Sequence, residues 1–177
     1  MISLWHNTSK LILILVLLCL CQPCFANNKE YALKAGFLFN FARFGQWQSH
    51  NPSDEYFTLC SPDKNFIDIA NTVVAGKTVH SHILKSKHTP LNTANFSDCE
   101  MLFITNNTFE NWQTTAHQEP LNMMLVGENT DFIKNGGHIR FFLSGGKVRF
   151  EISPERLKNS GLTMSSKVLR LARLVDK

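Results

Sequence analysis

Two cysteines carry the most readily assigned chemistry in this sequence. The chain has five cysteines, and Cys19, Cys21 and Cys24 lie in an N-terminal segment with the features of an export signal. The remaining pair, Cys60 and Cys99, is even in number, which in an oxidising compartment favours a disulfide over two free thiols. Closing a loop of about 40 residues would stabilise the fold by roughly 4 kcal/mol through the entropy of the unfolded chain. Two cysteines lack the paired ligands of a zinc site, so we expect a Cys60–Cys99 disulfide and no metal.

Three arginines are candidates for binding chemistry. Arg43 lies between Phe41 and Phe44, and Arg170 and Arg173 lie three residues apart in a segment predicted to be helical, so they would share a face. An arginine among aromatic residues can simply stack on a ring at the surface, or it can help to bind an anionic or aromatic ligand. Both interpretations stay open. Arg43, Arg170 and Arg173 are the predicted ligand-binding residues.

The histidines and one glycine-lysine motif could also do chemistry, but their patterns are incomplete. His80 and His82 would share one face of a strand, with His88 nearby, yet no carboxylate or cysteine completes a metal site. Residues 75–78 (AGKT) resemble the end of a phosphate-binding loop, but Asn71 stands where that loop needs its first glycine. We therefore expect neither a metal nor a nucleotide cofactor.

The sequence contains no recognisable catalytic set. No G-x-S-x-G or H-E-x-x-H pattern is present, and the disulfide would leave the exported chain without a free cysteine. Glu128 and Asp131 are interpreted as turn residues rather than as paired acid–base carboxylates. We expect a protein that is not an enzyme.

The first 26 residues have the order of a signal peptide. Lys10 precedes the aliphatic run of residues 11–20, and Ala26 ends a small-x-small site. The run is about half of the roughly 20 apolar residues that a membrane-spanning helix needs, and none of the three leader cysteines follows the small residue that lipidation requires. We expect cleavage after Ala26, which leaves residues 27–177 in the periplasm.

The expected mature chain is mildly basic. Of 18 Lys and Arg residues only Lys10 lies in the leader, which leaves 17 against 14 Asp and Glu. These charges are scattered rather than gathered in the dense basic stripe of a nucleic-acid-binding protein. About 150 residues without repeats or linkers fit one domain.

The apolar periodicity predicts helices alternating with short strands. The predicted helices are residues 29–45, 66–74, 109–117, 154–159 and 165–174. The predicted strands are residues 56–60, 82–85, 101–105, 122–126, 138–143 and 147–152. The last two strands flank Ser144-Gly145-Gly146 as a hairpin, with Arg140, Arg149 and Glu151 pointing away from its apolar face. The pattern indicates an α/β fold with a mixed sheet flanked by helices, in which a C-terminal β-hairpin is followed by helices.

Three blocks of the sequence resemble the YfiR family of periplasmic proteins. They are residues 31–44 (YALKAGFLFNFARF) followed by Trp47, the hairpin segments 136–141 and 145–152, and residues 161–173 (GLTMSSKVLRLAR). Cys60 and Cys99 fall where that family has its structural disulfide. Some members have a second cysteine pair, which this sequence lacks.

The resemblance implies regulation rather than catalysis. Proteins of this family bind the periplasmic sensor region of an inner-membrane diguanylate cyclase and restrain cyclic-di-GMP synthesis and biofilm formation. Reduction of the Cys60–Cys99 bridge would then destabilise the repressor and release the cyclase. The sequence leaves open whether the protein dimerises, whether it senses a small aromatic or anionic ligand instead, and whether it is an uncharacterised hydrolase.

Overall fold

The structure, a computed structural model, describes residues 23–48, 55–91, 96–115 and 122–175. Its helices are α2 (Pro23–Phe44), α3 (Lys64–Val74), the 3-10 turn η2 (Asn106–Thr108), α4 (Phe109–Thr114), α5 (Pro154–Asn159) and α6 (Ser166–Leu169). Its strands are β1 (Gly45–Trp47), β2 (Tyr56–Ser61), β3 (Thr78–Val79), β4 (His82–His88), β5 (Met101–Ile104), β6 (Met124–Gly127), β7 (Ile139–Ser144), β8 (Lys147–Ile152), β9 (Leu162–Met164) and β10 (Arg173–Leu174).

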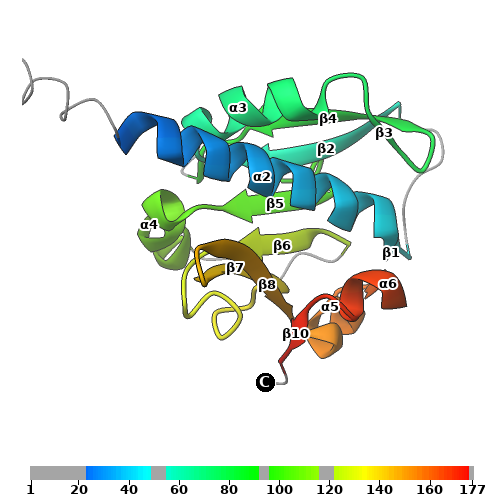
Figure 1. The fold of residues 1–177 in the computed structure, drawn as a ribbon. Coiled ribbons are helices and arrows are strands. Elements are labelled where there is room, and N and C mark those ends of the chain that lie inside the picture. The colour runs from blue at the N-terminus through cyan, green and yellow to red at the C-terminus, as the bar shows by residue number, and fades with distance from the viewer. Residues whose placement is uncertain (1–22, 49–54, 92–95, 116–121, 176–177) are drawn as a thin grey trace, which may run out of the picture.

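One mixed sheet organises the molecule (Figure 1), in the order β10-β8-β7-β6-β5-β2-β4-β3. The strands β4, β2, β5, β6 and β7 are parallel to one another, whereas β3 and β8 run antiparallel to their neighbours β4 and β7. A second ladder of two strands, β1 and β9, joins the end of α2 to the C-terminal region. This is the predicted α/β architecture with a mixed sheet flanked by helices.

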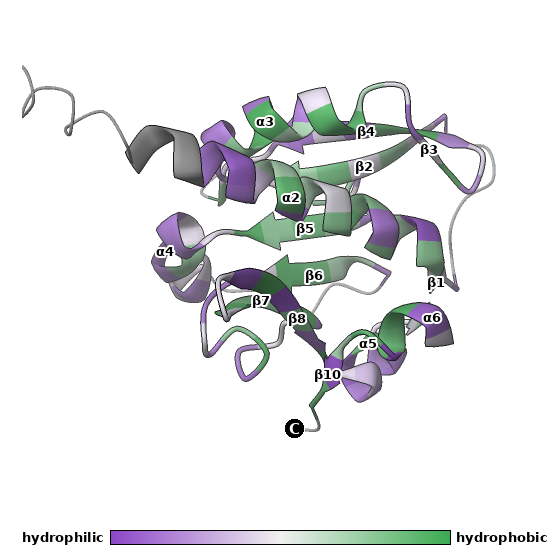
Figure 2. Ribbon diagram, in the orientation of Figure 1, coloured by the Kyte–Doolittle hydropathy of each residue, from purple (hydrophilic) through white to green (hydrophobic). Residues whose placement is uncertain are grey.

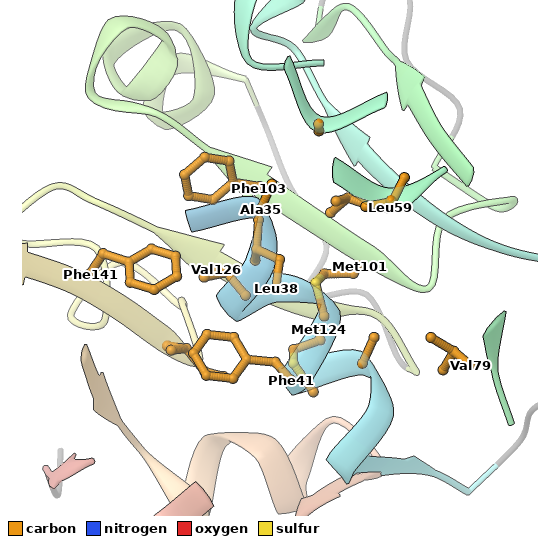
Figure 3. Close-up of a cluster of buried hydrophobic side chains, with 14 of the residues drawn as sticks. Ala35, Leu38, Phe41, Leu59, Val79, Met101, Phe103, Met124, Val126 and Phe141 are labelled. Atoms are coloured by element: carbon orange, nitrogen blue, oxygen red, sulfur yellow. The ribbon is translucent and has the colours of Figure 1, made fainter. Parts of the chain in front are cut away.

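Successive side chains of the buried strands point to opposite faces of the sheet, so the core is divided between the two faces. One face is covered by α2 and α3, and Figure 3 shows Ala35, Leu38 and Phe41 of α2 lying over side chains such as Phe103 and Phe141 of the sheet. The other face carries a second cluster built from α4, the loop that follows β6, and the two cysteines. Each face buries apolar area, which is the main source of stability for such a layered fold.

The second cluster contains the disulfide between Cys60 and Cys99. The two Cα atoms lie 5.8 Å apart, and the bridge joins the end of β2 to the segment that leads into β5. Both cysteines are buried, at 0% and 5% exposure.

The C-terminal hairpin has the predicted register. Ile139 pairs with Ile152, Phe141 with Phe150, and Leu143 with Val148. Gly145 and Gly146 adopt positive φ angles of 58° and 70° in the turn, which is the conformation that glycine permits. A serine directly before a proline is typical of a helix N-cap, and in the short helix that follows, α5, the Ser153 side chain accepts a hydrogen bond from the Arg156 backbone N–H.

The prediction of one long final helix over residues 165–174 was wrong. Helix α6 ends at Leu169, and after a turn the chain forms β10, which pairs in parallel with β8. A helix over residues 165–174 would have turned Leu171 toward the core, but this residue is 72% exposed. The apolar spacing matched a helix, but pairing with the free edge of β8 outweighs the weak preference of so short a segment.

The short strands β1, β3 and β9 and the turn η2 were not predicted, and the other differences are at element boundaries. The first helix begins at Pro23 rather than at residue 29, and the helix that starts at Phe109 ends at Thr114. Residues 116–117 of that prediction lie outside the described residues. Among the described residues, none of the helices combines the length and the apolar character needed to cross a membrane.

Candidate functional site

The outer face of the β7–β8 hairpin gathers charged residues around one aromatic ring. Because strand side chains alternate, Arg140 and Phe142 on β7 share this face with Arg149 and Glu151 on β8. The parallel pairing of β10 with β8 places Arg173 beside Glu151. We call these five residues the arginine face. Figure 2 shows a strongly hydrophilic stretch on β8 at this position.

Glu151 organises the arginine face. Its carboxylate accepts a hydrogen bond of 2.5 Å from Arg140 Nε and one of 2.9 Å from Arg173 Nε, and it also forms an ion pair with the Arg173 terminal nitrogen. Burial alone would raise the pKa of Glu151, but the hydrogen bonds and charges of the two arginines outweigh it and hold the pKa below its usual value. The carboxylate therefore stays ionised and fixes both guanidinium groups.

Phe142 lies against two guanidinium groups. The Cζ atoms of Arg173 and Arg140 are 4.3 Å and 5.4 Å from the centroid of its ring. Such cation–π contacts orient the guanidinium planes. With three arginines against one glutamate, the face has a formal charge of +2. It can therefore attract an acidic surface or an anionic ligand.

The structure places the three predicted ligand-binding arginines on different elements. Arg43 is exposed near the end of α2, with its Cζ atom 5.5 Å from the centroid of the Phe44 ring. Arg170 is exposed just after α6, and a hydrogen bond from Ser165 N to Phe44 O brings these two segments together. Arg173 instead belongs to the arginine face on β10. Arg170 and Arg173 therefore do not share a helix face, which corrects the prediction on which their pairing rested.

From the sequence, Arg140 and Glu151 were predicted only to point away from the apolar face of the hairpin. Both are buried, at 8% and 6% exposure, because β10 and their mutual ion pair cover them. Opposite charges at directly paired hairpin positions could have indicated this contact from the sequence. The contribution of Arg173 could not be foreseen without β10.

A second polar cluster lies at the carboxyl ends of the parallel strands. Asp63, just after β2, accepts hydrogen bonds from the Tyr31 hydroxyl at 3.0 Å and from Thr105 Oγ1 at 2.8 Å, and it also caps α3. Burial, and then the charge of Asp63, raises the pKa of Tyr31 above its ordinary value. These hydrogen bonds hold α2 against the sheet, so the role of this cluster is structural.

Glu128 belongs to the same edge of the sheet and is more than the predicted turn residue. Its carboxylate accepts a 2.6 Å bond from buried Lys34 and a 2.9 Å bond from the Asn106 backbone N–H. The side chains of Lys34 and Glu128 are each less than a tenth exposed. The sequence did contain a signal for this polar cluster, because polar residues directly follow buried strands and parallel strands bring their carboxyl ends to one edge of the sheet.

The histidines do not form the face that was considered for metal binding. His80 lies in the turn between β3 and β4 with a φ of 48°, and its Nε2 contacts the Gly45 carbonyl at 3.0 Å. His82 begins β4 and is buried, whereas His88 ends that strand and contacts the Pro62 carbonyl at 3.2 Å. Over the part of the chain that the structure describes, His, Cys, Asp and Glu form no group of three that could hold a metal ion.

Comparison with known proteins gives one family match. A family model described as YfiR/HmsC-like matches residues 31–173, which include α2 from Tyr31 onward, the whole sheet up to Arg173, and the disulfide. No curated protein matches the chain.

Proposed function

Because the chain belongs to the YfiR/HmsC-like family, we propose that it is a periplasmic negative regulator of cyclic-di-GMP synthesis. It binds the periplasmic sensor region of an inner-membrane diguanylate cyclase and thereby limits biofilm formation. The observation that carries this proposal is the family match, because it extends over residues 31–173 and thus over nearly all of the described fold.

The proposed regulation works by binding alone. A regulator that binds the inactive conformation of the cyclase more tightly than the active one shifts the population toward the inactive state. The arginine face supports such a role, because Glu151 already holds Arg140 and Arg173 in place before a partner arrives. A preorganised contact loses less conformational entropy on binding.

Export is part of the same proposal. Residues 1–26 act as a signal that is removed after Ala26, and the remaining chain oxidises in the periplasm. The Cys60–Cys99 bridge supports this localisation, since disulfides persist in oxidising compartments. N-terminal sequencing of the protein purified from periplasmic extract tests the cleavage position.

A deletion strain tests the proposed function. We expect cyclic-di-GMP and biofilm mass to rise when the gene is deleted and to return to the original level when it is restored. Detergent extracts of membranes should yield a diguanylate cyclase bound to the tagged protein. An unchanged cyclic-di-GMP level in the deletion strain would overturn the proposal.

A second candidate function is the sensing of a small aromatic or anionic ligand. The observation that favours it is the Phe142 ring with two guanidinium groups close to it, a combination of groups that can bind a planar anion. Calorimetric titration with aromatic amino acids and with nucleotides distinguishes it from protein binding. Binding that is lost in Arg173→Ala would support a sensor.

A further inference from the structure

The outer side of α2 carries a shallow groove of about 430 Å³ that the arginine face does not include. Its lining includes Leu33, Gly36, Phe37 and Phe39 of α2, with Val73 of α3 and Lys77 just beyond that helix. Leu33 is 49% exposed, although it is a large apolar residue. In Figure 1, α2 lies across the front of the sheet beside α3, and no other described element lies over it.

Gly36 is the unusual residue of this groove. A glycine in the interior of a helix costs about 1 kcal/mol relative to alanine, and α2 continues for eight residues beyond it. A Cβ atom at this position would meet nothing within 4 Å. The packing of the chain itself therefore gives no reason for a glycine here, and its effect is to keep the groove open.

The charges around the groove indicate what it binds. Lys77 lines it, with its Nζ atom 5.1 Å from the centroid of the Phe39 ring, and Lys29 and Arg43 are exposed on α2 on either side along the helix. The only acidic residue of α2 from Asn27 onward is Glu30, which is already paired with Lys34. A second copy of this chain would bring the same cations and be repelled, whereas an acidic partner would be attracted.

We propose that this groove binds an amphipathic helix of a partner protein that has acidic residues beside its apolar stripe. An apolar channel that runs along a helix is suited to a partner helix, whose side chains at successive turns enter it. The absence of a side chain at Gly36 lets the partner backbone approach closely. The identification of the partner as the diguanylate cyclase rests on the proposed function; the groove and the chemistry of its occupant do not.

Substitutions at Gly36 separate binding from folding. Gly36→Ala adds one methyl group and should raise the melting temperature through its higher helix propensity. Gly36→Leu should also leave the fold intact, because the added side chain extends into open space, but it fills the groove. We expect Gly36→Leu to weaken partner binding at least about tenfold, and Lys77→Glu to weaken it in a salt-dependent manner.

Photocrosslinking in cells identifies the occupant. A benzophenone amino acid replaces Leu33 in the full chain, and Glu110, exposed on α4, serves as the control position. We expect Leu33 alone to crosslink to a peptide that mass spectrometry maps to an acidic amphipathic helix, and the product to disappear in Gly36→Leu. A crosslink to a second copy of this chain, or an undiminished product in folded Gly36→Leu, would overturn the groove proposal.

The outcomes keep the two proposals apart. Suppose that deletion of the gene raises cyclic-di-GMP, and that the Gly36→Leu protein, expressed in the deletion strain, restores repression fully. The groove proposal then fails and the regulatory function stands. If deletion leaves cyclic-di-GMP unchanged while Leu33 crosslinks to an acidic helix of another protein, the cyclase assignment fails and the groove stands.

Discussion

The neutral imidazole of His138 illustrates how single residues in this protein are fixed by their neighbours. The Leu125 backbone N–H donates to Nδ1 at 2.9 Å, so that nitrogen must carry a lone pair, while Nε2 lies 2.9 Å from the Ser160 hydroxyl. Burial first, and then the charge of Arg156, lowers the pKa of His138 to about 4. Glu151 is the opposite case at the same scale, because two arginines keep it charged despite burial.

The depressed pKa of His138 predicts acid sensitivity. The pKa of a histidine in the unfolded chain is near 6.5. Between pH 6.5 and about 4, His138 therefore binds a proton in the unfolded chain but not in the folded protein. The contribution of His138 to stability is therefore fully present above pH 6.5 and falls by up to about 3 kcal/mol as the pH drops to 4. We expect urea denaturation across this range to show a flatter pH profile for His138→Asn, whose side-chain oxygen can still accept from Leu125 N–H.

The matching control is His88→Asn at an exposed position of β4. It makes the same substitution without removing a buried imidazole, so a flattening confined to His138→Asn comes from the buried ring. A wild-type profile that is flat between pH 6.5 and 4 would contradict the assignment of a buried neutral imidazole.

At the scale of elements, the loop that follows β6 is held against the sheet by one aromatic ring. Phe132 is fully buried, and its ring lies where Gly127 and Gly137 leave space. A Cβ atom on Gly137 would lie only 2.2 Å from this ring, and one on Gly127 only 2.5 Å. Neither glycine has a positive φ angle. The close approach of the Phe132 ring is therefore the reason that both positions are glycine.

Gly137→Ala is therefore expected to destabilise the domain by about 1–3 kcal/mol, because the buried ring must move within a packed cluster. Thermal or urea denaturation measures the change. The control is Gly36→Ala, which makes the same chemical substitution where there is space and should be stabilising. Equal effects of the two substitutions would show that Phe132 does not constrain the loop.

At the scale of the whole molecule, the disulfide and the β1–β9 ladder connect parts that are distant in the sequence. The bridge joins residues 39 positions apart, and the ladder pairs Gly45 with Met164. The bridge lies inside the apolar cluster on the α4 face, where reductant has little access. Its loss should therefore weaken the fold as a whole rather than loosen one edge.

For the double substitution Cys60→Ser and Cys99→Ser, we expect a loss of roughly 4 kcal/mol of stability, because a closed loop of this length restricts the unfolded chain. Chemical denaturation with and without reductant measures it, and cyclic-di-GMP in cells that carry the variant reports repression. If the variant folds and represses as the wild type does, the proposed link between bridge reduction and release of the cyclase fails.

Local patterns in the sequence were sufficient for the α/β class, most strands, the hairpin register and the cap at Ser153, because alternation, glycine turns and capping act over a few residues. The Cys60–Cys99 pair followed from counting, since the other three cysteines lie in the segment that was predicted to be a signal peptide. Only the tertiary structure decided that residues 173–174 form a strand, that Arg173 meets Glu151, and that Gly36 faces open space. Each of these depends on which segments become neighbours across the folded chain, and the free energy of such long-range contacts exceeds the weak local preference of a short segment.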